Sequence, residues 1–206
     1  MSCEYADVIS SISDVIVAMS AAAAAIFAYV GLSTWRKQLK GGAEYQLAKD
    51  VLKAAYRVRE AFDAVRNPAI FEYEYPEEMR STSGHLREEK KYEGTAHVYE
   101  KRWEQMASSF KELEEWHLQA QVEWVPEFQN RIKKLRLCRV ELMSAIQNLL
   151  EGYKDPGAHA TTTPQERREA RSVLYSGGGP EFDKFTPQIH EAIDEFEKWL
   201  RLKVSK

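Results

Sequence analysis

The chain begins with a long apolar stretch and continues with apolar residues at helical spacing. Residues 15–35 contain no charged side chain, and too few polar residues interrupt them for the one-sided pattern of a soluble core helix. A helix needs about 20 apolar residues to cross a hydrocarbon core of about 30 Å. The stretch therefore predicts a transmembrane helix at 15–35, with a soluble or interfacial helix as the alternative.

Beyond residue 42, apolar residues recur at spacings of three and four, which places them on one face of each helix. The pair Gly41-Gly42 predicts a break before the first of these helices, and Pro and Gly residues end the others. The expected helices cover residues 43–66, 92–124, 127–151, 164–175 and 181–203. The sequence thus predicts an all-α fold, in which an antiparallel bundle of about four long helices follows one transmembrane helix.

The most sustained apolar seam lies in the helix at 92–124, where spacings of four and three alternate without a break. Its members are Tyr92, Ala96, Tyr99, Trp103, Met106, Phe110, Leu113, His117, Ala120 and Trp124. The seam of the next helix contains one charged residue, Arg139. A buried guanidinium needs a partner, so a carboxylate or a bound anion is expected beside it.

The charges around the apolar stretch predict its orientation. Arg36, Lys37 and Lys40 follow it directly, and such residues favour the cytoplasmic side of a membrane. Residues 1–14 contain no Lys or Arg, unlike the start of a secretory signal. We therefore expect a retained anchor in a bacterial inner membrane, with 1–14 outside and 36–206 in the cytoplasm.

Composition and motifs argue against an enzyme. The formal net charge of −3 gives no overall basic excess, so the composition does not indicate a nucleic-acid binder and any anion site must be local. Glu114 and His117 form a single Glu-x-x-His pair, whereas di-metal bundles need two pairs and further glutamates. The triple glycine before Pro180 lacks the Lys-Ser or Lys-Thr of a phosphate-binding loop and is expected to be a flexible break. We expect no catalytic residues, metal or cofactor.

Clustered cations provide candidate sites for an anion or a nucleic acid. These cations lie in the segment RIKKLRLCR and in the short predicted helix after it. They could bind phosphates, or they could form a solvated surface in which glutamates pair with them. The candidates are Arg131, Lys133, Lys134, Arg136, Arg139, Arg167, Arg168 and Arg171.

Small residues line one face of the predicted transmembrane helix. They are Ser20, Ala24, Ala28 and Gly31. Small side chains let helix backbones approach closely in lipid, so this face predicts packing against other copies, with a monomeric anchor as the alternative. In an assembly, Asp14 would form a ring of carboxylates at a pore mouth, and such rings attract cations. Asp14 could equally be a flanking charge among the headgroups.

The sequence TWRKQLKGGAEYQLAKDVLKAAYRVREAF, followed closely by VRNP, spans residues 34–68. It resembles a widespread set of small single-span bacterial membrane proteins of prophages and anti-phage defence islands, and is similar in kind to the membrane effector of the Hailong system. That resemblance implies an oligomeric ion channel that a single-stranded DNA ligand holds closed. It would make the cations from Arg131 to Arg139 candidate DNA contacts.

Two functions follow as hypotheses. The first is an oligomeric inner-membrane effector, of anti-phage defence, whose bundle senses a ligand or partner and gates a pore or disrupts the membrane. The second is a membrane-tethered adaptor that recruits a cytosolic protein through its heptad surfaces. The expected partners are membrane lipid, further copies of the chain, a nucleic-acid or nucleotide ligand and a protein encoded in the same operon.

Overall fold

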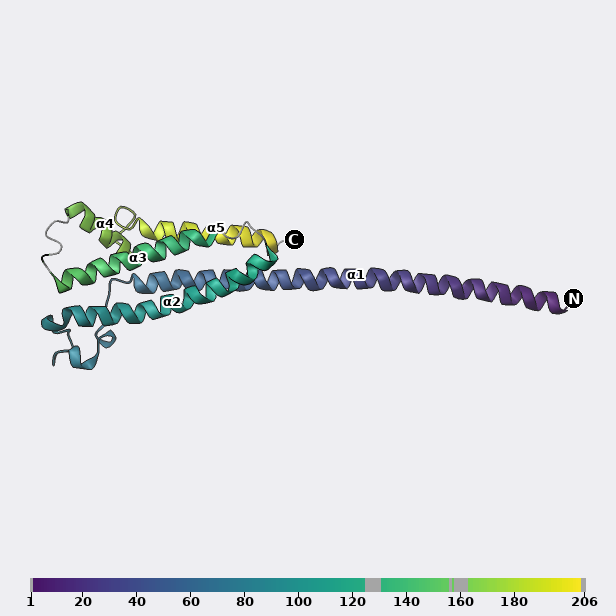
Figure 1. Cartoon of the computed structure of the whole chain (residues 1–206), viewed down its shortest axis with the longest axis horizontal. Helices are drawn as coiled ribbons and strands as arrows, with labels where there is room; N and C mark the ends of the chain where they lie inside the picture. The colour runs from purple at the N-terminus through teal and green to yellow at the C-terminus, as the bar shows by residue number, and fades with distance from the viewer. Residues whose placement is uncertain (1, 125–130, 156, 158–162, 205–206) are drawn as a thin grey trace. The chain divides into compact units, whose positions relative to one another are not determined.

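The computed structural model describes residues 2–124, 131–155, 157 and 163–204, and all long elements among them are helices (Figure 1). The α-helices are α1 (Ser2–Val65), α2 (Lys91–Glu123), α3 (Arg131–Lys154), α4 (Pro164–Leu174) and α5 (Phe185–Val204). Three single-turn helices lie between α1 and α2: η1 (Glu72–Glu74), η2 (Glu77–Met79) and η3 (Glu88–Lys90). The prediction of an all-α fold is confirmed. Pro126, Phe128 and the predicted start of a helix at 127 lie outside the described residues.

Helix α1 runs through Gly41 and Gly42, where the sequence predicts a break. That prediction is wrong. A glycine inside a helix costs about 1 kcal/mol relative to alanine, which weakens the helix without forbidding it. A Cβ atom added at either glycine would meet no atom within 4 Å, so these two positions are not needed for a close approach.

The chain divides into two compact units, Met1–Gln46 and Leu47–Lys206. The second unit is a bundle in which the end of α1 and helices α2, α3 and α5 surround one hydrophobic core. Successive long helices of this bundle run in alternating directions (Figure 1), as in other antiparallel bundles with short connections.

Polar side chains join the neighbouring helices along each edge of the bundle. Arg57 of α1 pairs with Glu112 of α2. The other pairs are Arg136 with Glu114 at 3.2 Å, Lys134 with Glu195 at 2.5 Å, and Tyr56 with Glu197 at 2.6 Å. These contacts are mostly exposed, and exposed ion pairs contribute about 0–1 kcal/mol each. They fix which helices are neighbours more than they stabilise the fold.

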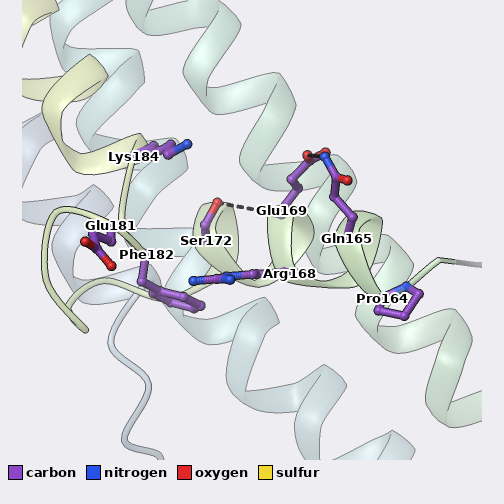
Figure 2. A pocket seen from close by; sticks show the side chains of 8 residues that line it. All are labelled: Pro164, Gln165, Arg168, Glu169, Ser172, Glu181, Phe182 and Lys184. Carbon is purple, nitrogen blue, oxygen red and sulfur yellow. Dashed lines mark hydrogen bonds between the residues drawn. The ribbon is translucent and has the colours of Figure 1, made fainter.

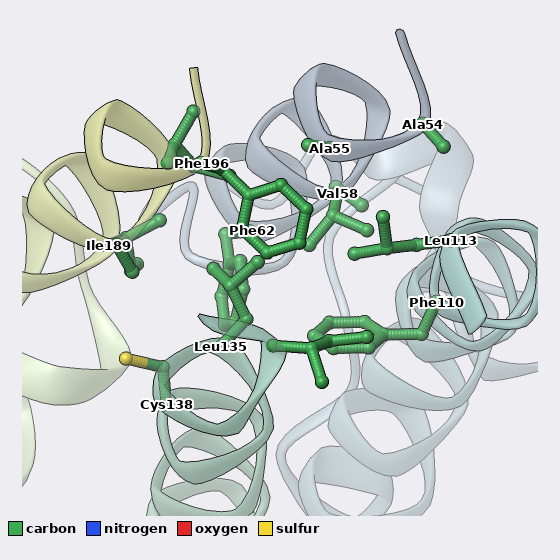
Figure 3. Close-up of a cluster of buried hydrophobic side chains, with 14 of the residues drawn as sticks. Ala54, Ala55, Val58, Phe62, Phe110, Leu113, Leu135, Cys138, Ile189 and Phe196 are labelled. Carbon is green, nitrogen blue, oxygen red and sulfur yellow. The ribbon is translucent and has the colours of Figure 1, made fainter. Parts of the chain in front are cut away.

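The apolar stripe that the sequence predicts at the end of α1 is completely buried. Its members are Ala48, Val51, Ala55, Val58, Phe62 and Val65. Phe62 lies near the centre of the cluster in Figure 3. Its ring meets Phe110 of α2 edge to face at 5.9 Å and Phe185 of α5 at 6.5 Å. Pairs of this geometry add about 0.5–1.5 kcal/mol beyond the burial of their area.

The apolar seam predicted in α2 is confirmed over most of its length, and apolar residues of α3 and α5 are buried in the same core. Tyr92, at the start of the α2 seam, is exposed instead of buried, as is Tyr153 near the end of α3. At the middle of α3, Cys138 is buried while Arg139 is only half-buried. A helix has 3.6 residues per turn, so a strict heptad drifts around it, and this drift brings Cys138 to the margin of the core (Figure 3).

An arginine of α2 holds the connection after α1 in place. That connection contains the short turns η1, η2 and η3. Arg102 donates to both carboxylate oxygens of Glu74, at 2.8 and 2.9 Å, and to the carbonyl oxygens of Asn67 and Ala69, both at 2.7 Å. Burial raises the pKa of Glu74, but the hydrogen bonds from Arg102 and the Phe71 amide outweigh it and leave that pKa lowered.

Helix α4 begins with a capping box, a pattern in which the side chains of Thr163 and Glu166 each bond the other residue's backbone amide. The Thr163 hydroxyl accepts a hydrogen bond from the Glu166 amide at 3.2 Å, and the Glu166 carboxylate accepts from the Thr163 amide at 2.7 Å. Pro164 occupies the first helical position, where no amide hydrogen is needed. Helix α5 begins at Phe185, four residues later than predicted, because the chain forms a turn at 180–182, directly after the triple glycine.

Candidate functional site

Helix α1 is apolar and mostly exposed from Ile16 to Trp35. Among the described residues, one helix, α1, is long and apolar enough to cross a membrane, and none of its most apolar 18-residue window is buried. Large side chains such as Phe27 and Tyr29 are each 77% exposed. In water this surface would be unfavourable by about 25 cal/mol per Å² of apolar area.

The small residues of the first unit lie on the exposed surface of α1. Ser20, Ala24, Ala28 and Gly31 are all exposed. The Ser20 hydroxyl donates to the carbonyl oxygen of Ile16 at 2.8 Å, so its hydrogen is already bonded within the helix. A Cβ atom at Gly31 would meet no atom within 4 Å. The side chain of Asp14 lies outside the described residues.

The candidate cations of α3 lie on three different sides of that helix. Lys134 pairs with Glu191 at 3.4 Å and with Glu195 at 2.5 Å, both on α5. Arg136 pairs with Glu114 on α2. Lys133 is exposed, and the side chain of Arg131 lies outside the described residues. A nucleic acid at Lys134 or Arg136 would have to displace the glutamates.

Arg139 packs on aromatic rings instead of carboxylates. Its guanidinium carbon lies 4.9 Å from the centre of the Phe110 ring and 5.8 Å from that of Trp103. Among the described residues, no carboxylate lies within ion-pair distance of it. The sequence predicts an inward cation with an anionic partner, and the structure instead gives a half-buried cation stacked between α2 and α3. Its charge is therefore not neutralised within the described part of the chain.

Two adjoining depressions form a groove between α2 and α3. One has a volume of about 490 Å³ and contains Arg136 and Arg139. The other has a volume of about 370 Å³ and contains Glu100 and Glu104. Trp103, Met143 and Gln147 line both. The groove is thus apolar along its middle, basic near one end and acidic near the other.

A third depression, of about 610 Å³, lies beside α4. Arg168 and Lys184 line it, together with Glu169 and Glu181. The Arg168 side chain points toward Phe182 (Figure 2). Two cations and two carboxylates give this surface no net charge, so it offers little attraction to a phosphate. Arg167 and Arg171 are exposed and do not line it.

A buried polar network that the sequence pattern does not predict is centred on Arg66, at the end of α1. This arginine is completely buried, with 0% of its surface exposed. It donates to Asp183 at 2.8 Å and to the hydroxyl of Thr186 at 2.5 Å. Its remaining acceptors are the carbonyl oxygens of Ser172, Val173 and Tyr175, at 2.7–3.1 Å. One side chain therefore joins the end of α1 to α4, the glycine turn and α5.

The triple glycine shapes the pocket that receives Asp183. Gly177, Gly178 and Gly179 have φ angles of 95°, 81° and 85°, a region in which residues with a Cβ atom are strained. The Gly177 amide donates to Asp183 at 3.0 Å, and Thr186 donates both its amide and its hydroxyl. Burial raises the pKa of Asp183, but the hydrogen bonds from Thr186, Arg66 and Gly177 outweigh it and hold that pKa well below its usual range.

Acid should weaken this network, because the folded state lowers the pKa of Asp183 and so favours its ionised form. The ionised carboxylate of Asp183 stabilises the folded state fully above its unfolded pKa of about 3.9. This contribution is lost as the pH falls toward the lower pKa of the folded state. We expect the free energy of unfolding to fall more steeply between about pH 5 and pH 2 in the unmodified chain than in Asp183→Asn. Parallel curves, measured by urea titration at each pH, would contradict this.

The residues considered for catalysis and metal binding do not come together. His117 is buried in the bundle, while Glu114 on the same helix pairs with Arg136. His190 is exposed on α5. Among the described residues, no group of three His, Cys, Asp or Glu side chains could hold a metal ion.

The chain was also compared with known proteins. No protein-family model, no curated protein and no solved structure matches it. Exposed surfaces of the chain that remain as candidates for function include the apolar part of α1 and the α2–α3 groove.

Proposed function

We propose that the chain is a single-span membrane protein that assembles with other copies of itself and acts as an effector on the membrane. The bundle would recognise a ligand or partner and, through the assembled spans, open a pore or disturb the bilayer. A role in anti-phage defence rests on the resemblance of residues 34–68 alone. Arg36, Lys37 and Lys40, all exposed, support a cytoplasmic bundle by the positive-inside rule.

The observation that supports this proposal is the contrast between the two parts of α1. From residue 47 onward its apolar stripe is buried in the bundle, whereas its apolar side chains from Ile16 to Leu39 are exposed. The second part of this helix is thus covered by the protein core. The first part would be most stable with its apolar side chains in a hydrocarbon layer. The exposed small residues Ala24 and Ala28 favour contact between spans in that layer.

A voltage-sensitive dye in cells that express the chain tests the effector function. We expect depolarisation after induction, or after the trigger is supplied. Ala24→Leu and Ala28→Leu should abolish it without removing the protein from the membrane fraction, because the larger side chains separate the spans. Ala22→Leu makes the same change about half a turn away from the small-residue face and should leave depolarisation intact. Recovery of the protein in the soluble fraction would contradict the whole proposal.

A second function, a membrane-tethered adaptor, is favoured by one observation: the α2–α3 groove is open to solvent and apolar along its middle. In that case the span would only anchor a docking surface. An unmodified protein that inserts into the membrane but does not depolarise it, even after its trigger is supplied, would favour the adaptor.

A DNA ligand can be tested separately on the full chain in detergent. Binding of short single-stranded DNA should weaken steeply as the salt concentration rises, since it depends on phosphate contacts. Replacement of the exposed Lys133 and Arg167 by Ser should then lower the affinity and the salt dependence. The absence of binding at low salt would exclude this ligand and leave a protein or another small molecule as the trigger.

A further inference from the structure

The depression beside α4 lies between two walls that come from different parts of the bundle (Figure 2). One wall is a single face of α4, on which the lining residues follow the helical spacing of three and four from Gln165 to Ser172. The other wall is the segment from Glu181 to Lys184, directly after the glycine turn. Its volume of about 610 Å³ lies within the range of roughly 300–1,000 Å³ that is usual for small-ligand pockets.

Among the described lining residues, each wall has one cation and one carboxylate. Arg168 and Glu169 lie on α4, and Glu181 and Lys184 lie on the opposite segment. Arg168, Glu181 and Lys184 form no ion pair with a described residue. The Glu169 carboxylate accepts from the neutral amide of Gln165 at 3.0 Å. The opposite charges of the two walls therefore do not neutralise one another across the depression.

The ring of Phe182 gives the second wall an apolar surface that is held in place. The side chain is half-buried, and a Cβ atom added at Gly178 would lie 3.0 Å from a carbon of this ring. The amides of Phe182 and Asp183 both donate to the carbonyl oxygen of Gly179, at 3.1 and 3.0 Å. The wall is thus ordered before a ligand arrives, which lowers the entropic cost of binding.

We propose that this depression binds a short peptide whose amino and carboxyl termini are both free. The carboxylate of the peptide pairs with Arg168 and Lys184, its ammonium group pairs with Glu169 and Glu181, and an apolar side chain contacts Phe182. A ligand with charge of one sign would be repelled by half of these groups, whereas a zwitterion satisfies both kinds. The site names the ligand that the proposed function leaves open, and rests on that function for its effect at the membrane.

Both walls also belong to the network that holds the end of α1. The Ser172 side chain lines the depression, and the Ser172 carbonyl accepts from Arg66 at 2.9 Å. Asp183, which accepts from Arg66 at 2.8 Å, stands in the chain between the lining residues Phe182 and Lys184. A peptide that contacts both walls therefore favours the arrangement in which Arg66 is fully bonded, and coupling of this kind is reciprocal.

Calorimetric titration of the full chain in mild detergent with the tripeptide alanyl-phenylalanyl-alanine tests the site. The peptide should be compared in four forms: both ends free, acetylated, amidated, and blocked at both ends. Blocking either end should lower the affinity several-fold, and blocking both should lower it further. Equal affinities, or no binding of the free form, would overturn the proposal. Free phenylalanine that binds as tightly as the tripeptide would overturn the assignment to a peptide.

Substitutions in the two walls test which charges meet which end. In Arg168→Gln, amidation of the peptide should cost less affinity than in the unmodified chain, and in Glu181→Gln acetylation should cost less. Both side chains are exposed, so folding should be unaffected. The control Arg167→Gln changes an exposed cation of α4 that does not line the depression and should leave all four affinities unchanged. Equal effects in Arg167→Gln and Arg168→Gln would contradict the pairing.

Two further outcomes separate the site from its coupling and from the proposed function. Asp183→Asn does not alter a lining residue but should lower the affinity of the free peptide several-fold, and an unchanged affinity would overturn the link to Arg66. Peptide binding by a chain that never depolarises the membrane would leave the site standing and remove the effector. Depolarisation by a chain that does not bind the peptide would do the reverse.

Discussion

Replacement of Arg66 by methionine should lower the free energy of unfolding by about 3–5 kcal/mol, the range seen when one partner of a buried ion pair is removed. The substitution leaves the Asp183 carboxylate without its cation and three carbonyl oxygens of α4 and the following residue without their donor. Methionine fills a similar volume, so the loss should reflect polar groups more than a cavity. Denaturation of the full chain in mild detergent, followed by tryptophan fluorescence, measures it.

Lys111→Met provides the matched control for this experiment. Lys111 forms an exposed pair with Glu115 at 3.9 Å, and such pairs contribute about 0–1 kcal/mol. A loss below about 1 kcal/mol for Arg66→Met as well would show that the buried network is not what holds α4 and α5 to the end of α1.

Replacement of Phe62 by alanine should also cost about 3–5 kcal/mol, the usual range for a buried phenylalanine. Phe62 is completely buried and its ring contacts aromatic rings of both α2 and α5. The variant loses the transfer free energy of the ring and leaves a cavity between three helices. The same fluorescence measurement applies, and near-ultraviolet circular dichroism should show weaker fixed packing of aromatic rings.

The control for Phe62→Ala is Tyr73→Ala, which removes an aromatic ring that is 76% exposed. Its effect should stay within about 0.5 kcal/mol, as for most surface substitutions. Equal losses in the two variants would contradict the central place of Phe62 in the core.

The helices could be predicted because their apolar residues follow the period of the helix itself. Val58 and Phe62 in α1, like Phe110 and Leu113 in α2, are buried where the spacing of three and four places them. Local signals such as the capping box at Thr163 were equally readable. Gly41-Gly42 was misread because a glycine pair is only a weak helix breaker, and the favourable residues on both sides outweigh it.

The polar sites could not be predicted, because their partners are distant in sequence. Arg66 follows Val65 and precedes Asn67-Pro68, so it looks like the solvated end of a helix. Its acceptors come 106–120 residues later, and no periodicity links them. The heptad spacing predicts Arg139 as an inward charge. A helix with 3.6 residues per turn departs from the strict heptad, so Arg139 lies beside the rings of Trp103 and Phe110 in α2 instead. The signal that could have been used was the carboxylate after the triple glycine.

The position of Arg66 has a consequence for synthesis. The end of α1 leaves the ribosome more than 100 residues before Asp183 and Thr186, while domains generally fold as units during translation. Until α5 emerges, the stripe that contains Phe62 is not covered by that helix, and Arg66 has not yet formed its hydrogen bonds to Asp183 and Thr186. In the proposed membrane-anchored form, the nascent chain would therefore carry an open apolar surface until α5 emerges, and early termination products should be prominent clients of chaperones and proteases.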